Sequence, residues 1–144
     1  MKILVLNGPN LNLLSLREPE IYGRTSYDEL CEKIRAHAAQ RGVEVEIFQS
    51  NHEGALVDAI QTAYGVCDGI VCNPAAYTHT SVALLDALRA VALPAVEVHL
   101  SDLSTREAFR QVSYIRPACI ATVMGRGVQG YLDAIDLLIA HLTK

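Results

Sequence analysis

The sequence lacks long hydrophobic runs and clusters of positive charge, and each absence excludes a class of protein. No apolar stretch approaches the roughly 18–20 residues that span a bilayer, because a charged residue, Asn or Gly interrupts every candidate. The nine arginines and three lysines are scattered along a chain of net charge −4, which argues against a phosphate-backbone ligand. We therefore expect no membrane segment and no nucleic-acid partner.

The chain also lacks a secretion signal and paired cysteine motifs. Its first apolar run carries one Lys and stops at Asn7-Gly8 without a small-residue cleavage site, so we interpret it as a strand. Cys31, Cys67, Cys72 and Cys119 show no Cys-x-x-Cys spacing, and a chain that is 51% hydrophobic needs no disulfides. These features predict buried free thiols in a soluble, cytoplasmic protein, folded as a single domain over residues 1–144.

Short runs rich in valine and isoleucine alternate with segments of helical periodicity. The expected strands are Ile3–Leu6, Val43–Phe48, Gly69–Cys72, Ala95–Val98 and Cys119–Met124. The first helix is expected between the cap Ser26 and Gly42, the second around Val57, Ile60 and Tyr64, the third over His79–Val91, and the last between Val128 and Leu142. This succession predicts an α/β fold: a flavodoxin-like three-layer sandwich around a five-stranded parallel sheet, with strand order 2-1-3-4-5 preferred.

In such sheets ligands bind outside the carboxyl ends of the strands. Polar residues follow three of the expected strands, at Asn7–Asn10, Asn73–Ser81 and His99–Arg106, a composition that suits a small polyhydroxylated or carboxylated molecule. A long non-helical segment is expected over about residues 10–23, a length typical of a lid. The alternative is that its leucines simply pack this segment onto the surface.

Glu97 and His99 lie two positions apart on an expected strand, so their side chains point to the same face. This spacing suits a carboxylate that orients a general acid or base. Two alternatives stay open: a buried structural histidine, or a metal site of two histidines and one carboxylate that includes His79. No His-x-x-x-His or Cys-x-x-Cys pattern favours the metal.

Three other functions have weaker support from the sequence: dinucleotide binding, phosphate acceptance by a response regulator, and imine catalysis. The segment Gly125–Gly130 spells the dinucleotide fingerprint, but the further strand and acidic residue of that βαβ unit are missing, which favours a tight turn before a helix. A response regulator would need acidic residues where Asn7 and Asn73 stand. An imine mechanism has no suitable lysine among Lys2, Lys33 and Lys144.

Ordered motifs along the whole chain resemble the type II 3-dehydroquinate dehydratase family. The matching segments are Leu6–Leu14, Arg17–Gly23, Gln49–Gly54, Asn73-Pro74, Tyr77–Ser81, Glu97–Ser101, Arg106-Glu107, Phe109-Arg110 and Gln129–Tyr131. The resemblance implies a hydro-lyase that converts 3-dehydroquinate to 3-dehydroshikimate by anti elimination of water through an enolate. It implies a place in the shikimate pathway or in quinate catabolism, and no metal or cofactor.

The resemblance also implies the catalytic residues. Tyr22 would be the base; ionising a tyrosine at pH 7 costs about 4 kcal/mol, an amount that the lid residue Arg17 can supply at about 4 Å. Asn10 would hold the water that stabilises the enolate. His99, oriented by Glu97, would protonate the departing hydroxyl.

The implied substrate contacts come from several loops. The backbone amides of Leu100 and Ser101 would hold the substrate carboxylate with Asn73, and His79 and Arg110 would hold ring hydroxyls. Asp86 would enter from a neighbouring subunit of a homododecamer, a tetramer of trimers. Four residues depart from the family pattern: Ser15 and Ala75, where glycine is usual and a side chain disfavours positive φ, and Asp102 and Ser104 in the loop after His99.

Two functions of other classes stay open from the sequence. A flavodoxin-like binding module would take up flavin and colour the protein. A non-catalytic assembly protein would leave Arg17 and Tyr22 without consequence.

Overall fold

Five parallel strands form the central sheet of the molecule, in the order β2-β1-β3-β4-β5. The computed structural model describes residues 1–16, 18–22 and 24–144, without the side chain of Tyr22. The strands are β1 (Lys2–Asn7), β2 (Glu44–Gln49), β3 (Gly69–Asn73), β4 (Ala95–His99) and β5 (Ala121–Met124). The predicted strand order is confirmed.

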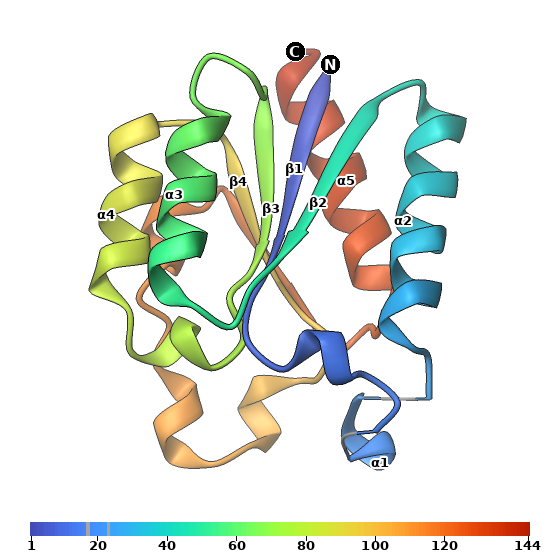
Figure 1. Ribbon diagram of the computed structural model, residues 1–144, viewed down its shortest axis with the longest axis vertical. Coiled ribbons are helices and arrows are strands. Elements are labelled where there is room, and N and C mark those ends of the chain that lie inside the picture. Colours follow the sequence, from blue (N-terminus) through green and yellow to red (C-terminus); the bar gives the residue numbers. More distant parts are fainter. Residues whose placement is uncertain (17, 23) are drawn as a thin grey trace.

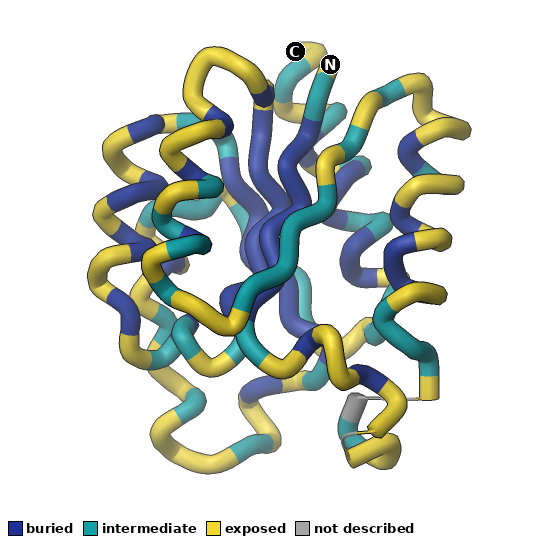
Figure 2. The backbone as a smooth tube through the Cα atoms, in the orientation of Figure 1, coloured by how far each residue is buried: buried dark blue, intermediate teal, exposed yellow. Residues whose placement is uncertain are grey.

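Helices cover both faces of the sheet (Figure 1). The helices α2 (Tyr27–Arg41) and α5 (Gln129–Leu142) cover one face, and α3 (Glu53–Ala63) and α4 (Val82–Val91) cover the other. Val96 and Val98 of β4 pack into the cluster beneath α2 and α5, whereas Ile70 and Cys72 of β3 pack into the cluster beneath α3 and α4. The strands β1, β3 and β4 are buried between these helices, and the edge strands β2 and β5 are more exposed (Figure 2). The predicted three-layer sandwich is confirmed.

The signals predicted for the first long helix act as expected. Ser26 Oγ accepts a hydrogen bond of 3.1 Å from the amide of Glu29 at the start of α2, and Gly42 ends the helix in the left-handed region with φ 70°. The buried positions Leu30, Cys31, Ile34 and Ala38 form one apolar face, which packs on the sheet. All four cysteines lie in the described part of the chain and are free thiols.

Two predicted boundaries were wrong. The helix expected from His79 begins at Val82, because Ser81 Oγ accepts from the amide of Leu84 at 3.0 Å and so caps the helix there. His79 lies in a preceding 3-10 helix, η2 (Ala75–His79). The strand expected from Cys119 begins at Ala121, since the Cys119 amide bonds back to the carbonyl of Arg116 in a turn.

The segment over residues 10–23 differs from the expected non-helical form. It contains a 3-10 helix, η1 (Leu11–Leu13), and one short turn of helix, α1 (Pro19–Tyr22). Leu11 and Leu14 are buried in the core cluster beneath α2 and α5, which anchors the first half of the segment on the sheet. Arg17 and Gly23 lie outside the described residues.

The described helices are all too short or too polar to cross a membrane. The carboxyl ends of the strands meet at one end of the molecule, opposite the two chain termini (Figure 1). Short helical turns gather at that end. Besides η1 and η2 they include η3 (Leu103–Thr105) and η4 (Ala108–Gln111), whereas η5 (Arg116–Ala118) packs beside α4.

Gly8 brings the end of β1 against the end of β3. Its amide donates to the carbonyl of Asn73 at 2.8 Å. A Cβ atom on Gly8 would overlap the carbonyl group of Pro74 and lie 2.9 Å from the Pro74 Cα, so only glycine fits.

Gly8→Ala is expected to lower the free energy of unfolding by about 3 kcal/mol, because the clash is with backbone that cannot rotate away. Urea denaturation measures the loss. Gly54→Ala in α3 is the control, because a Cβ there has no atom within 4 Å, and it should change stability by less than about 1 kcal/mol. Equal stability of Gly8→Ala and wild type would contradict the close approach of the two strands.

Candidate active site

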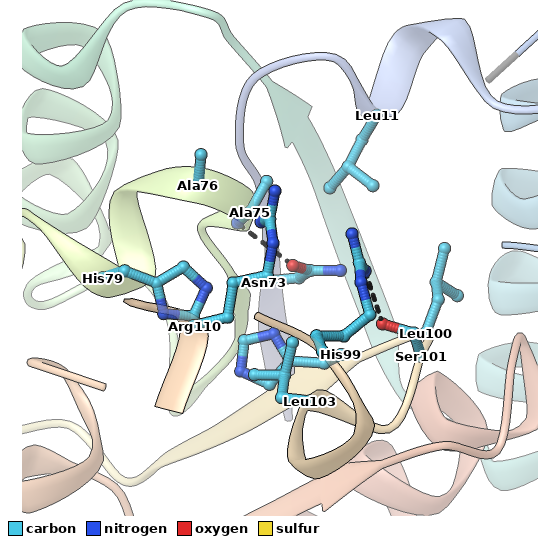
Figure 3. A pocket seen from close by; sticks show the side chains of 11 residues that line it. Leu11, Asn73, Ala75, Ala76, His79, His99, Leu100, Ser101, Leu103 and Arg110 are labelled. Atoms are coloured by element: carbon cyan, nitrogen blue, oxygen red, sulfur yellow. Dashed lines mark hydrogen bonds between the residues drawn. The ribbon is translucent and has the colours of Figure 1, made fainter. Parts of the chain in front are cut away.

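A small pocket opens at the carboxyl ends of β3 and β4. Its wall is built by the ends of these strands and by η1, η2, η3 and η4 (Figure 3). The lining residues are Leu11, Asn73, Ala75, Ala76, His79, His99, Leu100, Ser101, Leu103, Arg106 and Arg110. Two histidines and two arginines on one small pocket favour a polar or anionic ligand.

Glu97 and His99 form a buried pair in which His99 lines the pocket and Glu97 lies behind it. The Nε2–H of His99 donates to Oε2 of Glu97 at 2.5 Å, and the two side chains are 5% and 0% exposed. The two side chains lie on the same face of β4, as their two-residue spacing predicts. Because Nε2 is engaged, Nδ1 is the ring atom that can exchange a proton with a molecule in the pocket.

Glu97 accepts from three further side chains. Ser113 Oγ donates to Oε2 at 2.8 Å, and Thr122 Oγ1, from the neighbouring strand β5, donates to Oε1 at 3.0 Å. The guanidinium of Arg116 spans both oxygens, with Nε 2.9 Å from Oε1 and Nη2 3.2 Å from Oε2. Burial by itself would raise the pKa of Glu97, but the hydrogen bonds from His99, Arg116 and Ser113 outweigh it and lower the pKa to about 2.

His79 presents one ring nitrogen to the pocket. Its Nδ1 lies 2.7 Å from the carbonyl oxygen of Val112, which can only accept, so Nδ1 carries the proton and Nε2 is left as an acceptor. Burial lowers the pKa of His79, which favours this neutral form. Arg110 lies on the same side of the pocket, and its guanidinium donates to Glu107 at 2.7 Å.

A chain of buried hydrogen bonds holds Asn73. Its amide nitrogen donates to the Tyr131 hydroxyl at 2.8 Å, and that hydroxyl donates to Oδ1 of Asn7 at 2.7 Å. Asn7 in turn donates to the hydroxyl of Tyr27 at 3.3 Å. Burial raises the pKa of Tyr27 to about 12, and it also raises the pKa of Tyr131, so both phenols stay neutral.

The glycine-rich turn after β5 supports the loop after β4. The amides of Gly125 and Gly127 donate to the carbonyls of Ser101 and Leu100, each at 3.1 Å, and both glycines have positive φ. Helix α5 follows at Gln129. The prediction of a tight turn before a helix is confirmed, and the turn fixes the backbone at Leu100 and Ser101.

The pocket brings together six of the predicted site residues. These are Asn73, His79, His99, Leu100, Ser101 and Arg110. Asn10 is exposed beside the pocket, with its amide bonded to Oδ1 of Asn51 at 3.0 Å, and Asp86 is exposed on α4. The predicted roles of Arg17 and of the Tyr22 side chain lie outside the described residues.

Sequence reasoning placed Arg106 among the polar residues after the fourth strand without a specific role, and it gave no role to Leu11, Ala76 or Leu103. Arg106 is 10% exposed, and its Nη1 donates to Oγ of Ser101 at 3.2 Å. A basic residue five positions after Ser101 in a loop was the available signal.

Within the described residues, no group of three His, Cys, Asp or Glu is arranged to hold a metal ion.

Two of the departures noted in the sequence have positive φ: Ser15 at 80° and Ala75 at 53°. The third, Asp102, caps η3 by accepting from the amide of Ser104 at 3.0 Å. The fourth, Ser104, donates its hydroxyl to the same carboxylate oxygen at 2.6 Å. These two polar residues therefore stabilise the loop locally.

Comparison with known proteins gives one consistent result. The model of the family described as Dehydroquinase class II matches residues 1–139. A 3-dehydroquinate dehydratase of Ruegeria pomeroyi is 57% identical over 98% of this chain and 95% of the relative. One of Geotalea daltonii is 54% identical over the full length of both chains. The crystal structure of a type II dehydroquinase from Butyrivibrio crossotus superposes with a TM-score of 0.95 at 50% identity, covering 96% of this chain and 97% of that one.

The low pKa of Glu97 predicts a pH dependence of stability. The carboxyl has an ordinary pKa of 4.5 and a pKa of about 2 in the folded protein. Its contribution is therefore complete above pH 4.5 and is lost as the pH falls toward 2, in total roughly 3 kcal/mol. Urea denaturation between pH 2 and 5 should show this loss in wild type and not in Glu97→Gln. The exposed strand residue Glu44 provides the control Glu44→Gln, and parallel curves for wild type and Glu97→Gln would refute the assignment.

Proposed function

The chain belongs to the type II dehydroquinase family and dehydrates 3-dehydroquinate, and from this premise we propose how its pocket carries out the reaction. The buried His99–Glu97 pair at the wall of a polar pocket is the observation that carries the proposal. The pair supplies a proton donor next to groups suited to a carboxylate and several hydroxyls. The product is 3-dehydroshikimate.

The elimination proceeds through an enolate. A base removes the proton next to the substrate carbonyl, and the electron pair of that C–H bond moves onto the carbonyl oxygen. When the pair returns, the bond to the hydroxyl on the β carbon breaks in the anti sense, and the hydroxyl leaves as water with a proton from His99. The remaining double bond is conjugated with the carbonyl.

Tyr22 is the proposed base, and Arg17 lowers the cost of its ionisation. These two roles rest on the resemblance of Arg17–Gly23 to the family motif. Asn10 holds the water that stabilises the enolate oxygen, a role supported by its place beside the pocket, where Asn51 fixes its backbone. A lost oxyanion donor costs typically 2.7–4 kcal/mol of transition-state stabilisation.

His99 is the proposed acid. Its Nδ1 is the ring atom left for the substrate, and the ionised Glu97 stabilises the imidazolium before proton transfer. The same hydrogen bond fixes the plane of the ring. A positioned general acid contributes typically a factor of 10²–10⁴ to the rate.

The other pocket residues hold the substrate. Its carboxylate binds to the backbone amides of Leu100 and Ser101 and to Asn73, supported by the clamped backbone of that loop. Its ring hydroxyls bind to His79, through the acceptor Nε2, and to Arg110. This division leaves the reacting carbons between His99 and the segment that precedes α2.

Asp86 acts in a neighbouring subunit of a homododecamer built from four trimers. It is exposed on α4, and Val82, one turn earlier on the same face, is 51% exposed. Phe109 and Val112, which flank Arg110 close to the pocket, are 64% and 52% exposed. An assembly that covers this apolar surface would bring Asp86 to the next pocket.

The enzyme works in the cytoplasm, in the shikimate pathway or in quinate catabolism.

Ultraviolet absorbance of chelator-treated protein mixed with 3-dehydroquinate tests the function, because the conjugated product absorbs where the substrate does not. The absorbance should rise, and it should rise equally after borohydride treatment in the presence of substrate, since no imine forms. Folded protein without any rise would contradict the proposed function. Bound flavin colour would then favour the binding module.

Tyr22→Phe should keep the fold and lower kcat by about 10²–10⁴-fold, because phenylalanine cannot accept the proton. The same absorbance assay measures the loss, and circular dichroism checks the fold. Tyr64→Phe is the matched control, since Tyr64 is 69% exposed at the end of α3 and away from the pocket. A fully active Tyr22→Phe would remove Tyr22 from the mechanism.

A further inference from the structure

Arg116 reaches the catalytic pair from outside the pocket. It begins η5, and its guanidinium hydrogen bonds to both oxygens of Glu97 at 2.9 and 3.2 Å, although its side chain is 43% exposed. A two-pronged guanidinium–carboxylate pair fixes orientation as well as charge. The hydrogen bonds from Ser113 and Thr122 also orient Glu97, but they carry no charge.

Arg116 is the cation that contacts the Glu97 carboxylate on the side away from the pocket. The other titratable groups that interact with Glu97 or His99 include Cys72 in β3, His79 in η2 and Cys119 after η5, and Arg110 in η4 acts on His79. Burial raises the pKa of Cys119 to about 12 and that of Cys72 well above its ordinary value, so both thiols are neutral. Arg110 pairs with Glu107 on the pocket side.

We propose that Arg116 is a positioning residue for the dehydration: it holds the Glu97 carboxylate in place and shares its charge, so that His99 can release its proton to the departing hydroxyl. The inference rests on the proposed role of His99 as the acid. Arg116 does not line the pocket and touches no substrate atom.

The physical reason is a balance of charge. If the imidazolium of His99 were the only cation beside the buried carboxylate, the full Coulomb attraction would stabilise the protonated ring. Release of the proton would then be slow. A cation on the far side of the carboxylate weakens that attraction and still leaves the hydrogen bond that orients the ring. Arg116 thereby adjusts how readily His99 gives up its proton.

Arg116→Gln removes the charge and keeps one hydrogen-bond donor. It should lower kcat about tenfold, leave KM within about twofold, and move the alkaline limb of the kcat–pH profile to higher pH by about half a unit. ¹⁵N NMR of the His99 imidazole without substrate should show the same upward movement of its titration. Arg116→Lys keeps the charge without the fork, so its pH profile should lie closer to that of wild type.

The matched control is Arg41→Gln. Arg41 has a side chain of similar exposure, 41%, and pairs with Asp136 between α2 and α5, away from Glu97. Its kcat, its pH profile and its His99 titration should equal those of wild type. Thermal denaturation checks that each variant is folded. If Arg116→Gln does not fold, the pH profile of Arg116→Lys decides the question.

The outcomes separate cleanly. A fall in kcat without movement of the pH profile or of the His99 titration would reduce Arg116 to a structural role and overturn the proposal. Unchanged kcat would overturn it as well. If wild type itself does not turn over 3-dehydroquinate, the proposed function fails, while the NMR titration still decides whether Arg116 governs the proton of His99.

Discussion

The pocket end of the molecule depends on the buried carboxylate of Glu97. An ionised carboxylate in a protein interior is tolerated only where protein groups replace its water. Its partners come from β4 itself, from β5 and from the connection between these two strands. The carboxylate therefore fixes the path of that connection, which has three short 3-10 helices and no long helix, and it fixes the ring of His99 at the same time. One buried charge thus sets both the local fold and the orientation of the His99 ring.

Short-range signals were enough to predict the layers of the fold. Valine-rich runs, a capping serine before α2 and a glycine after it act within a few residues, and right-handed connections limit the possible strand orders. The predictions failed where neighbouring signals compete. The segment from His79 has helical periodicity, but Ser81 caps the helix two residues later. The apolar run at Cys119 looks like a strand, although a turn at Arg116 holds its first residues outside the sheet.

The pocket was predictable from sequence where chemistry follows the end of a strand, as at Asn73 and His99. The two-residue spacing on a strand was enough to predict that Glu97 and His99 lie on the same face. The remaining support comes from distant positions: Arg116 lies 19 residues from Glu97, and Tyr131 lies 124 residues from Asn7. No periodicity encodes such contacts, because they arise only when the connection folds back and when α5 packs on the sheet. The chemistry of the pocket was therefore visible in the sequence, whereas the groups that hold it in place were not.

Asn73 holds a strained residue in place and also offers a hydrogen-bond donor to a ligand at this end of the sheet. Its side-chain oxygen accepts from the amide of Ala75 at 3.1 Å and holds that residue at φ 53°, where a side chain is disfavoured. Its amide nitrogen donates one hydrogen to Tyr131, so the second hydrogen is the one left for a ligand. A ligand that binds Asn73 therefore meets a group whose rotation would release both the strained turn and the buried tyrosine. Because rotation is so costly, the amide is oriented before the ligand arrives, and binding loses little entropy in ordering it.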